Sequence, residues 1–202
     1  AADHPLDRAV DVGCGVGDWT RSYAEFCRHV VGLDINRSFV REAQRRTTDD
    51  ASSGTVEFRV DDGVAPEVLE GAGLIAFGSV FQYMEDARVR EAIDDAGRAQ
   101  TSHDVVYLRT TVVPEGRAPR GDDGAWYRPP QRYRDWITDA GYDIELEKRS
   151  GELISVDAIR RMVPGLSIGG AARWTTHLGT LLNKVGSGDE GLQFNNWVLR
   201  RR

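Results

Sequence analysis

Three glycines at alternate positions are the first residues in this sequence whose spacing suggests chemistry. Gly13, Gly15 and Gly17 follow a short apolar run at residues 8–12 and precede a helical pattern. Glycines at such a turn permit a tight bend and let backbone N–H groups approach a ligand closely. An acid, Asp11, stands two residues before the first glycine. A pyrophosphate would be repelled by that carboxylate, whereas a cationic or amino-bearing ligand would be attracted to it.

A second acid follows at the distance expected of a nucleotide site. Asp34 comes 17 residues after the last glycine, at the end of the apolar run at residues 29–34. This position suits a carboxylate that binds two ribose hydroxyls. The alternative for Asp34 is an N-cap of the helix that starts near Asn36. A nicotinamide dinucleotide fits less well, because its fingerprint needs a third glycine where this chain has Asp18.

The elements that must position these residues alternate along the chain. Strands are expected at residues 8–12, 29–34, 56–60, 73–78, 104–109, 142–147 and 195–199. Helices are expected at residues 18–28, 37–47, 85–100 and 129–140. This order predicts an α/β fold: a doubly wound, mainly parallel seven-stranded sheet with helices on both faces and an antiparallel edge strand. We expect a single domain over residues 1–202, with a helical insertion at about 151–191 between the last two strands.

With these positions in register, the sequence resembles the class I S-adenosylmethionine-dependent methyltransferases, a Rossmann-like superfamily. Residues 11–17 match its acid-x-Gly-x-Gly-x-Gly motif, and Asp34 matches its ribose-binding acid. Residues 61–63 match its adenine-contacting acid, and residues 78–83 its loop after the fourth strand. The resemblance implies S-adenosylmethionine as cofactor and S-adenosylhomocysteine as product. The cofactor-binding residues expected from the motifs and their neighbours are Asp11, Gly13, Cys14, Gly15, Gly17, Trp19, Asp34, Ile35, Asp61, Asp62, Gly63, Gly78, Ser79 and Val80. Of the two acids after the third strand, Asp62 is favoured for the adenine contact. Cys14 is expected to fit the glycine loop because it is small, and a redox role is not favoured.

The acceptor side is predicted from residues farther along the chain. Tyr83 is expected to orient the nucleophile and Arg109 to meet an acidic group on the substrate, which makes these two the catalytic candidates. Trp126 and Tyr127 are expected to form aromatic walls for a small substrate. The alternative for all four is structural: packing, a surface ion pair, or cover for the sheet edge. No clear base is present, and methyl transfer by in-line displacement depends mainly on positioning.

Two departures from the family pattern concern the substrate. An acid usually begins the fourth strand in this family, and Ala72-Gly73 stand there. Tyr83 occupies a position at which many small-molecule members carry histidine. The favoured function is methyl transfer to an oxygen or nitrogen of a small molecule. The alternatives are a protein or peptide N-methyltransferase, an NAD(P)-dependent oxidoreductase, and a non-catalytic module that only binds the cofactor.

Composition narrows the class of protein. The 202 residues carry 26 basic and 32 acidic side chains, a net charge of −6 and a pI near 5.3, which argues against nucleic acid as a partner. No apolar run approaches the roughly 20 residues needed to cross a bilayer, so no membrane partner is expected. Two cysteines, Cys14 and Cys27, are too few for a disulfide framework or a metal cage, and no metal is expected.

The start of the chain leads to further expectations. It opens Ala-Ala-Asp-His-Pro without an initiator Met or a signal-peptide pattern, from which we expect a cytoplasmic protein that is trimmed or is a fragment. We expect the part of the substrate lid that relatives build from N-terminal helices to be incomplete. Oligomeric state is expected to be monomer or homodimer.

Overall fold

The computed structural model describes residues 6–47, 54–63, 65–101, 104–113, 124–149 and 193–202. Seven strands form one sheet in the order β3-β2-β1-β4-β5-β7-β6. Their bounds are β1 Leu6–Val12, β2 Cys27–Asp34, β3 Thr55–Val60, β4 Leu74–Gly78, β5 Val105–Val112, β6 Tyr142–Arg149 and β7 Gln193–Arg201. Adjacent strands among β1 to β5 pair in parallel, and β7 pairs antiparallel with both β5 and β6. The predicted mixed sheet is confirmed, with the antiparallel strand β7 one place in from the β6 edge.

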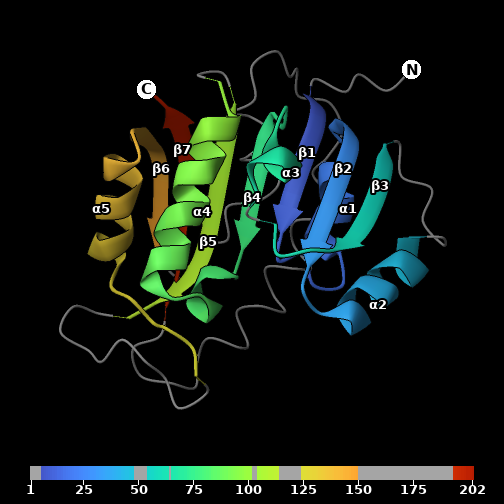
Figure 1. The fold of residues 1–202 in the computed structure, drawn as a ribbon, viewed down its shortest axis with the longest axis horizontal. Coiled ribbons are helices and arrows are strands. Elements are labelled where there is room, and N and C mark those ends of the chain that lie inside the picture. The colour runs from blue at the N-terminus through green and yellow to red at the C-terminus, as the bar shows by residue number, and fades with distance from the viewer. Residues whose placement is uncertain (1–5, 48–53, 64, 102–103, 114–123, 150–192) are drawn as a thin grey trace.

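Helices cover both faces of this sheet. Their bounds are α1 Asp18–Tyr23, α2 Arg37–Thr47, α3 Pro66–Leu69, α4 Asp86–Ala99 and α5 Pro130–Asp139, with a short 3-10 helix, η1, at Phe81–Tyr83. In Figure 1, α4 and α5 cover the near face of the sheet and α1 lies behind it. The parallel strands all end along the lower edge in this view, so the loops that follow them gather there.

Two separate apolar layers hold the helices to the sheet, because side chains alternate between the faces of each strand. One layer contains Val12, Phe77 and Leu108 from the strands together with Ile93 of α4 and Trp136 of α5. The central strand β4 is buried on both faces, with Leu74 to Phe77 all at 0% exposure, as expected of a parallel strand between two helical layers.

The opposite layer joins α1 to the same strands. It contains Ala9, Ala76 and Tyr107 from three strands, with Tyr23 of α1 packed among them. β1 lies between β2 and β4, so the strand order reverses at β1, and ligands of doubly wound sheets bind at the carboxyl ends of the strands next to such a reversal. The glycine loop after β1 is therefore at the position where this fold holds a ligand.

Several element boundaries differ from those expected. The first helix ends at Tyr23 instead of residue 28, because Cys27 and Arg28 join β2, whose Cys27 pairs with Leu6. β5 continues to Val112 because β7 pairs with it along its whole length. The short elements α3 and η1 were not expected from the sequence. The insertion expected at 151–191 lies outside the described residues, and none of the described helices is long and apolar enough to cross a membrane.

Candidate functional site

The glycine loop between β1 and α1 is shaped by positions that require glycine. Gly13 and Gly17 have φ values of 75° and 82°, in the left-handed region that strains other residues. A Cβ atom at Gly13 would lie 2.8 Å from the Cβ of Val80, and one at Gly17 would lie 2.4 Å from the Cζ of Phe58. The loop therefore lies against β3 and the segment after β4, and a larger residue at either position would force these neighbours apart.

Asp34 is held between this loop and α2 by two backbone donors. The N–H of Gly15 donates to its Oδ2 at 2.9 Å, and the N–H of Asn36 donates to its Oδ1 at 2.8 Å. Asn36 itself caps α2, because its side-chain oxygen accepts a hydrogen bond from the N–H of Ser38 at 2.9 Å. Since Asn36 fills that role, each carboxylate oxygen of Asp34, which has two lone pairs, retains acceptor capacity for a hydroxyl.

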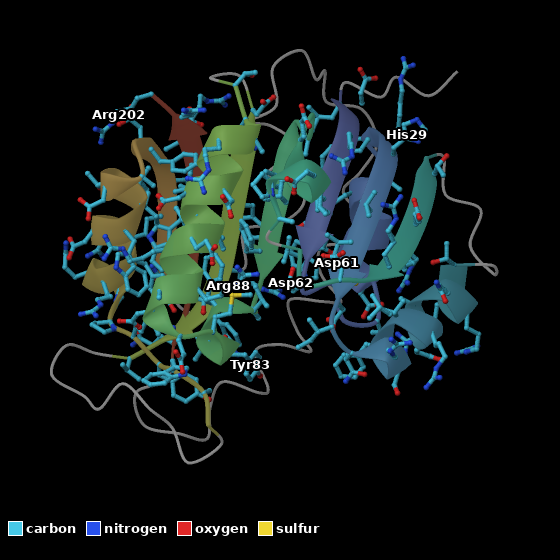
Figure 2. All side chains as sticks on the ribbon, in the orientation of Figure 1. His29, Asp61, Asp62, Tyr83, Arg88 and Arg202 are labelled. Atoms are coloured by element: carbon cyan, nitrogen blue, oxygen red, sulfur yellow. The ribbon has the colours of Figure 1, made fainter. Side chains whose placement is uncertain are left out.

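The loops after β2 and β3 meet beside this carboxylate. The side chain of Ile35 is 75% exposed, so an apolar surface is available directly after Asp34. Asp61 accepts a hydrogen bond from the N–H of Gly63 at 2.8 Å, and Asp62 accepts one from Arg88 of α4 at 2.7 Å. Figure 2 shows the two acids near the carboxyl ends of the parallel strands, with Arg88 on the adjacent helix. Which of the two acids contacts an adenine stays a prediction.

Asp11 is a buried carboxylate under the glycine loop. It is 2% exposed and accepts a hydrogen bond from the hydroxyl of Thr20 at 2.6 Å. Burial raises the pKa of Asp11 to about 6, against the opposing effects of the Thr20 hydrogen bond and the positive charge of Arg109. The same burial, together with the charges of Asp11 and Asp34, raises the pKa of the Cys14 thiol, which is therefore protonated and suited to packing rather than to redox chemistry.

Arg109 lies across β4 from Asp11. Its guanidinium carbon is 5.1 Å from the centroid of the Trp19 ring, so the cation rests on an aromatic face of α1. Its Nε is buried and has no hydrogen-bond partner among the described residues. A Cβ atom at Gly78 would lie 3.7 Å from Nη2 of Arg109 and 3.8 Å from Oδ1 of Asp11, which places both charged groups around this glycine.

The segment after β4 turns sharply at Ser79. This is the one residue other than glycine with positive φ among the described residues, at 59°, and its N–H donates to the carbonyl of Arg109 at 2.7 Å. A left-handed serine is strained, and such strain gathers at functional sites. Val80 contacts the glycine loop, and Tyr83 on η1 is 69% exposed at the lower end of the fold in Figure 2.

Arg128, which was not singled out from the sequence, organises the segment that follows β5. It is 2% exposed and donates to Asp86 at 2.8 Å, to the carbonyl of Phe81 at 2.9 Å and to the carbonyl of Met84 at 2.6 Å. Although burial opposes it, hydrogen bonds from Arg128 and Arg132 lower the pKa of the Asp86 carboxyl, which favours its charged form. The buried guanidinium therefore fixes η1 and the start of α4 to the start of α5.

A shallow cleft of about 480 Å³ lies over this arginine. Its lining comprises Glu85, Asp86, Ala87, Trp126, Arg128, Pro129 and Arg132. The N–H of Trp126 donates to the carbonyl of Gln82 at 2.6 Å, so the aromatic wall is tied to η1. Tyr127, between Trp126 and Arg128, is half-buried.

The four residues expected on the acceptor side do not form one group. Arg109 contacts Trp19 of α1, whereas Trp126 stacks on Arg128, which also contacts Trp136 of α5. The ring contact of Arg109 is thus with Trp19, whereas Trp126 contacts Arg128 and is hydrogen-bonded to η1.

Other supporting residues also escaped sequence reasoning. Thr20 orients Asp11, and Phe58 fills the space that Gly17 leaves. Gln82 is buried, and its side-chain oxygen accepts a hydrogen bond from the N–H of Thr111 at 3.2 Å. Asn36, which directly precedes a helix, carried a recognisable N-cap signal; the other three did not, because their partners are distant in sequence.

The comparison with protein families agrees with this geometry. Residues 9–102 match the family model described as "Methyltransferase domain". Over these residues, just under half of the chain, the sequence resembles a methyltransferase domain. The matched segment includes the glycine loop and the acids Asp11 and Asp34. The resemblance inferred from the motifs is thereby confirmed.

Individual relatives differ in what they act on. The domain is 31% identical over 101 residues to phosphoethanolamine N-methyltransferase 1 of Caenorhabditis elegans; the match covers 50% of this chain and 21% of that protein, so the chain spans about a fifth of this relative's length. Among solved structures, geranyl diphosphate C-methyltransferase from Streptomyces coelicolor, in complex with S-adenosylhomocysteine, gives a TM-score of 0.67 at 14% identity, covering 100% of this chain and 76% of that one. The cyclase SpnF gives a TM-score of 0.71 at 15% identity, covering 97% and 74%. These likenesses confirm the fold.

Proposed function

We propose that this methyltransferase domain binds S-adenosylmethionine at the carboxyl ends of β1 to β4 and transfers its methyl group to a nitrogen or oxygen of a small molecule. The observation that carries the proposal is the fixed carboxylate of Asp34, held by Gly15 and Asn36 with acceptor capacity remaining and the exposed Ile35 directly after it. A polar group for ribose hydroxyls next to an apolar surface for adenine is the arrangement that an adenosine needs.

The other residues of the site fit the rest of the cofactor. We expect either Asp61 or Asp62, which follow β3, to recognise the adenine amino group, and the glycine loop allows close backbone approach. The ionisable Asp11 suits the positively charged amino group at the methionine end. When bound, the cofactor supplies a methyl group on a sulfonium, which the nucleophile attacks in line. Much of the rate of such a displacement comes from positioning, so the lack of a clear base is consistent with the proposal.

A small molecule is favoured as acceptor for two reasons. The curated relative and the Streptomyces neighbour carry names that specify small substrates, phosphoethanolamine and geranyl diphosphate. The cleft beside Trp126 is of a size that suits a small ligand. Because that neighbour is named a C-methyltransferase, a carbon acceptor belongs in the test.

Calorimetric titration with S-adenosylhomocysteine tests the cofactor. We expect Asp34→Ala to weaken binding by more than tenfold, because the ribose contact is lost. Asp94→Asn, an exposed position on α4, serves as the matched control and should leave binding unchanged. Absence of binding to the folded wild-type protein at millimolar ligand would contradict the proposal.

Turnover is tested separately, because the cyclase neighbour indicates that this fold alone does not impose methyl transfer. Cofactor with an isotopically labelled methyl group is incubated with panels of phosphorylated amines, prenyl diphosphates, phenols and peptides, and products are identified by mass spectrometry. A labelled small molecule supports the proposal. A labelled peptide alone assigns a protein acceptor instead, and cofactor binding without any labelled product favours a non-catalytic module.

A further inference from the structure

Two opposite charges lie around one glycine of the sheet. Asp11 on β1 and Arg109 on β5 are separated by β4. Gly78 of β4 pairs with Arg109 and lies two residues beyond Ala76, which pairs with Asp11, and it has no side chain. A methyl group at Gly78 would be in van der Waals contact with both, at 3.8 Å from Oδ1 of Asp11 and 3.7 Å from Nη2 of Arg109. A carboxylate and a guanidinium therefore both lie next to a position that has no side chain.

The guanidinium is held in place by its surroundings. It rests on the Trp19 ring, which lies 6.1 Å from the ring of Tyr107 and 6.2 Å from that of Tyr23, both buried. Tyr107 is fixed in turn by donating its hydroxyl proton to Asn196 at 2.8 Å. The backbone carbonyl of Arg109 also accepts the N–H of Ser79 at 2.7 Å. An arginine supported in this way offers its remaining N–H groups in a fixed direction, which suits an anion.

The opposite charges of Asp11 and Arg109 on either side of Gly78 match those of a zwitterion. An α-amino acid carries an ammonium and a carboxylate on one carbon, and S-adenosylmethionine ends in such a group. We propose that Arg109 binds the α-carboxylate of the methionine end of the cofactor, while Asp11 on the other side of Gly78 faces the α-ammonium. This inference rests on the proposed cofactor. It gives Arg109 a role toward the cofactor in place of the expected role toward an acidic group on the acceptor.

Ligands that differ by single groups test the assignment. S-adenosylhomocysteine has both the ammonium and the carboxylate, its decarboxylated analogue S-adenosyl-3-thiopropylamine keeps only the ammonium, and 5′-methylthioadenosine has neither. Binding of each is measured by calorimetry to the wild-type protein and to Arg109→Gln, Arg109→Lys and Asp11→Asn. Arg90→Gln, at an exposed position on α4, is the matched control for loss of one positive charge.

The variants at Arg109 and Asp11 should weaken binding of different sets of ligands. Arg109→Gln should weaken binding of S-adenosylhomocysteine by about 10- to 100-fold, the range for a hydrogen bond between charged groups, and should change binding of 5′-methylthioadenosine less than twofold. Its effect on the decarboxylated analogue, which has no carboxylate, should be much smaller than its effect on S-adenosylhomocysteine. Asp11→Asn should weaken both amine-bearing ligands and leave 5′-methylthioadenosine unchanged. If Arg109→Gln does not fold, Arg109→Lys carries the test, because it keeps the charge but loses the planar fork: S-adenosylhomocysteine should weaken several-fold and the decarboxylated analogue should not.

Other outcomes overturn the inference. Equal weakening of all three ligands by the Arg109 variants would show that the arginine only supports the fold around Trp19. Unchanged binding of S-adenosylhomocysteine with a raised KM for the acceptor would return Arg109 to the acceptor side. If no ligand of the three binds the folded wild-type protein, the proposed function itself fails, which is distinguishable from failure of the assignment of Arg109.

Discussion

The buried carboxylate of Asp11 should make the affinity for S-adenosylhomocysteine depend on pH. Burial raises the pKa of Asp11 to about 6, and the nearby charge of Asp34 contributes in the same direction. Below that pH the group is neutral and offers no charge to an ammonium; above it the group is ionised. The ligand's own ammonium stays largely protonated up to pH 7, because α-amino groups titrate near pH 8. Affinity should therefore rise as pH increases from 5 to 7.

The size of the rise follows from the ionised fraction. With a pKa of about 6, the fraction of ionised Asp11 is roughly one eleventh at pH 5 and roughly ten elevenths at pH 7. If only the ionised protein binds tightly, the dissociation constant falls about tenfold over this range, equivalent to about 1.4 kcal/mol. The hydrogen bond from Thr20 and the positive charge of Arg109 both lower the pKa of Asp11 and are already included in the value of about 6.

Calorimetry at pH 5, 6 and 7 and constant ionic strength measures this change, with thermal denaturation at each pH to verify that the protein is folded. Asp11→Asn is the control: its affinity should be lower than that of the wild type at pH 7 and nearly constant from pH 5 to 7. A flat profile for the wild-type protein would refute the reasoning. A slope that persists in Asp11→Asn would show that Asp11 is not the group that titrates.

Three further predictions concern the loops around the site. Gly17→Ala should lower the free energy of unfolding by about 2–5 kcal/mol in urea titrations, because the left-handed backbone and the contact with Phe58 both penalise a Cβ atom. Gly141 has the same φ of 82° but no atom within 4 Å of a Cβ at that position, so Gly141→Ala should lower the free energy of unfolding by only about 1–2 kcal/mol. Arg128→Met should lower the free energy of unfolding by about 3–5 kcal/mol, since removing this buried cation takes a donor from the carbonyls of Phe81 and Met84 and leaves Asp86 with Arg132 alone. A loss under about 1 kcal/mol would contradict the anchoring role. Tyr83→Phe should reduce kcat/KM for a methyl acceptor roughly tenfold and leave binding of S-adenosylhomocysteine within twofold, and equal kinetics for the two proteins would show that the hydroxyl does not orient the acceptor.

Much of the geometry around the glycine loop could be predicted because its signals are local. The spacing of Gly13, Gly15 and Gly17 after a strand specifies a loop that other residues cannot form, and Asp34 at the end of the next strand follows from parallel pairing. The positive φ values of the glycines and the hydrogen bond from Gly15 to Asp34 agree with that interpretation. The boundaries were less accurate: the first helix ended five residues early because pairing of Cys27 with Leu6 outcompeted helix propensity there.

The acceptor half was harder to predict because its residues act through distant partners. Arg128 sits in an aromatic and proline-rich stretch that suggested an exposed wall, yet its guanidinium is buried through bonds to residues more than 40 positions earlier. Nothing in the neighbouring sequence distinguishes it from Arg132, which is exposed. A charged residue can be buried without a large energetic penalty only when the tertiary structure supplies its partners. No local sequence pattern therefore predicts such burial.

The amino-acid sequence by itself determined the class of fold, the glycine loop, the ribose-type acid and the resemblance to methyltransferases, because each depends on backbone conformation or on side-chain alternation over a few residues. Tertiary structure decided which charges share a space. Asp11 and Arg109 stand 98 positions apart, and only the insertion of β4 between β1 and β5 brings them to either side of Gly78. The same packing sets the guanidinium of Arg109 on the Trp19 ring, because the register of neighbouring strands fixes which face of the sheet a residue lies on.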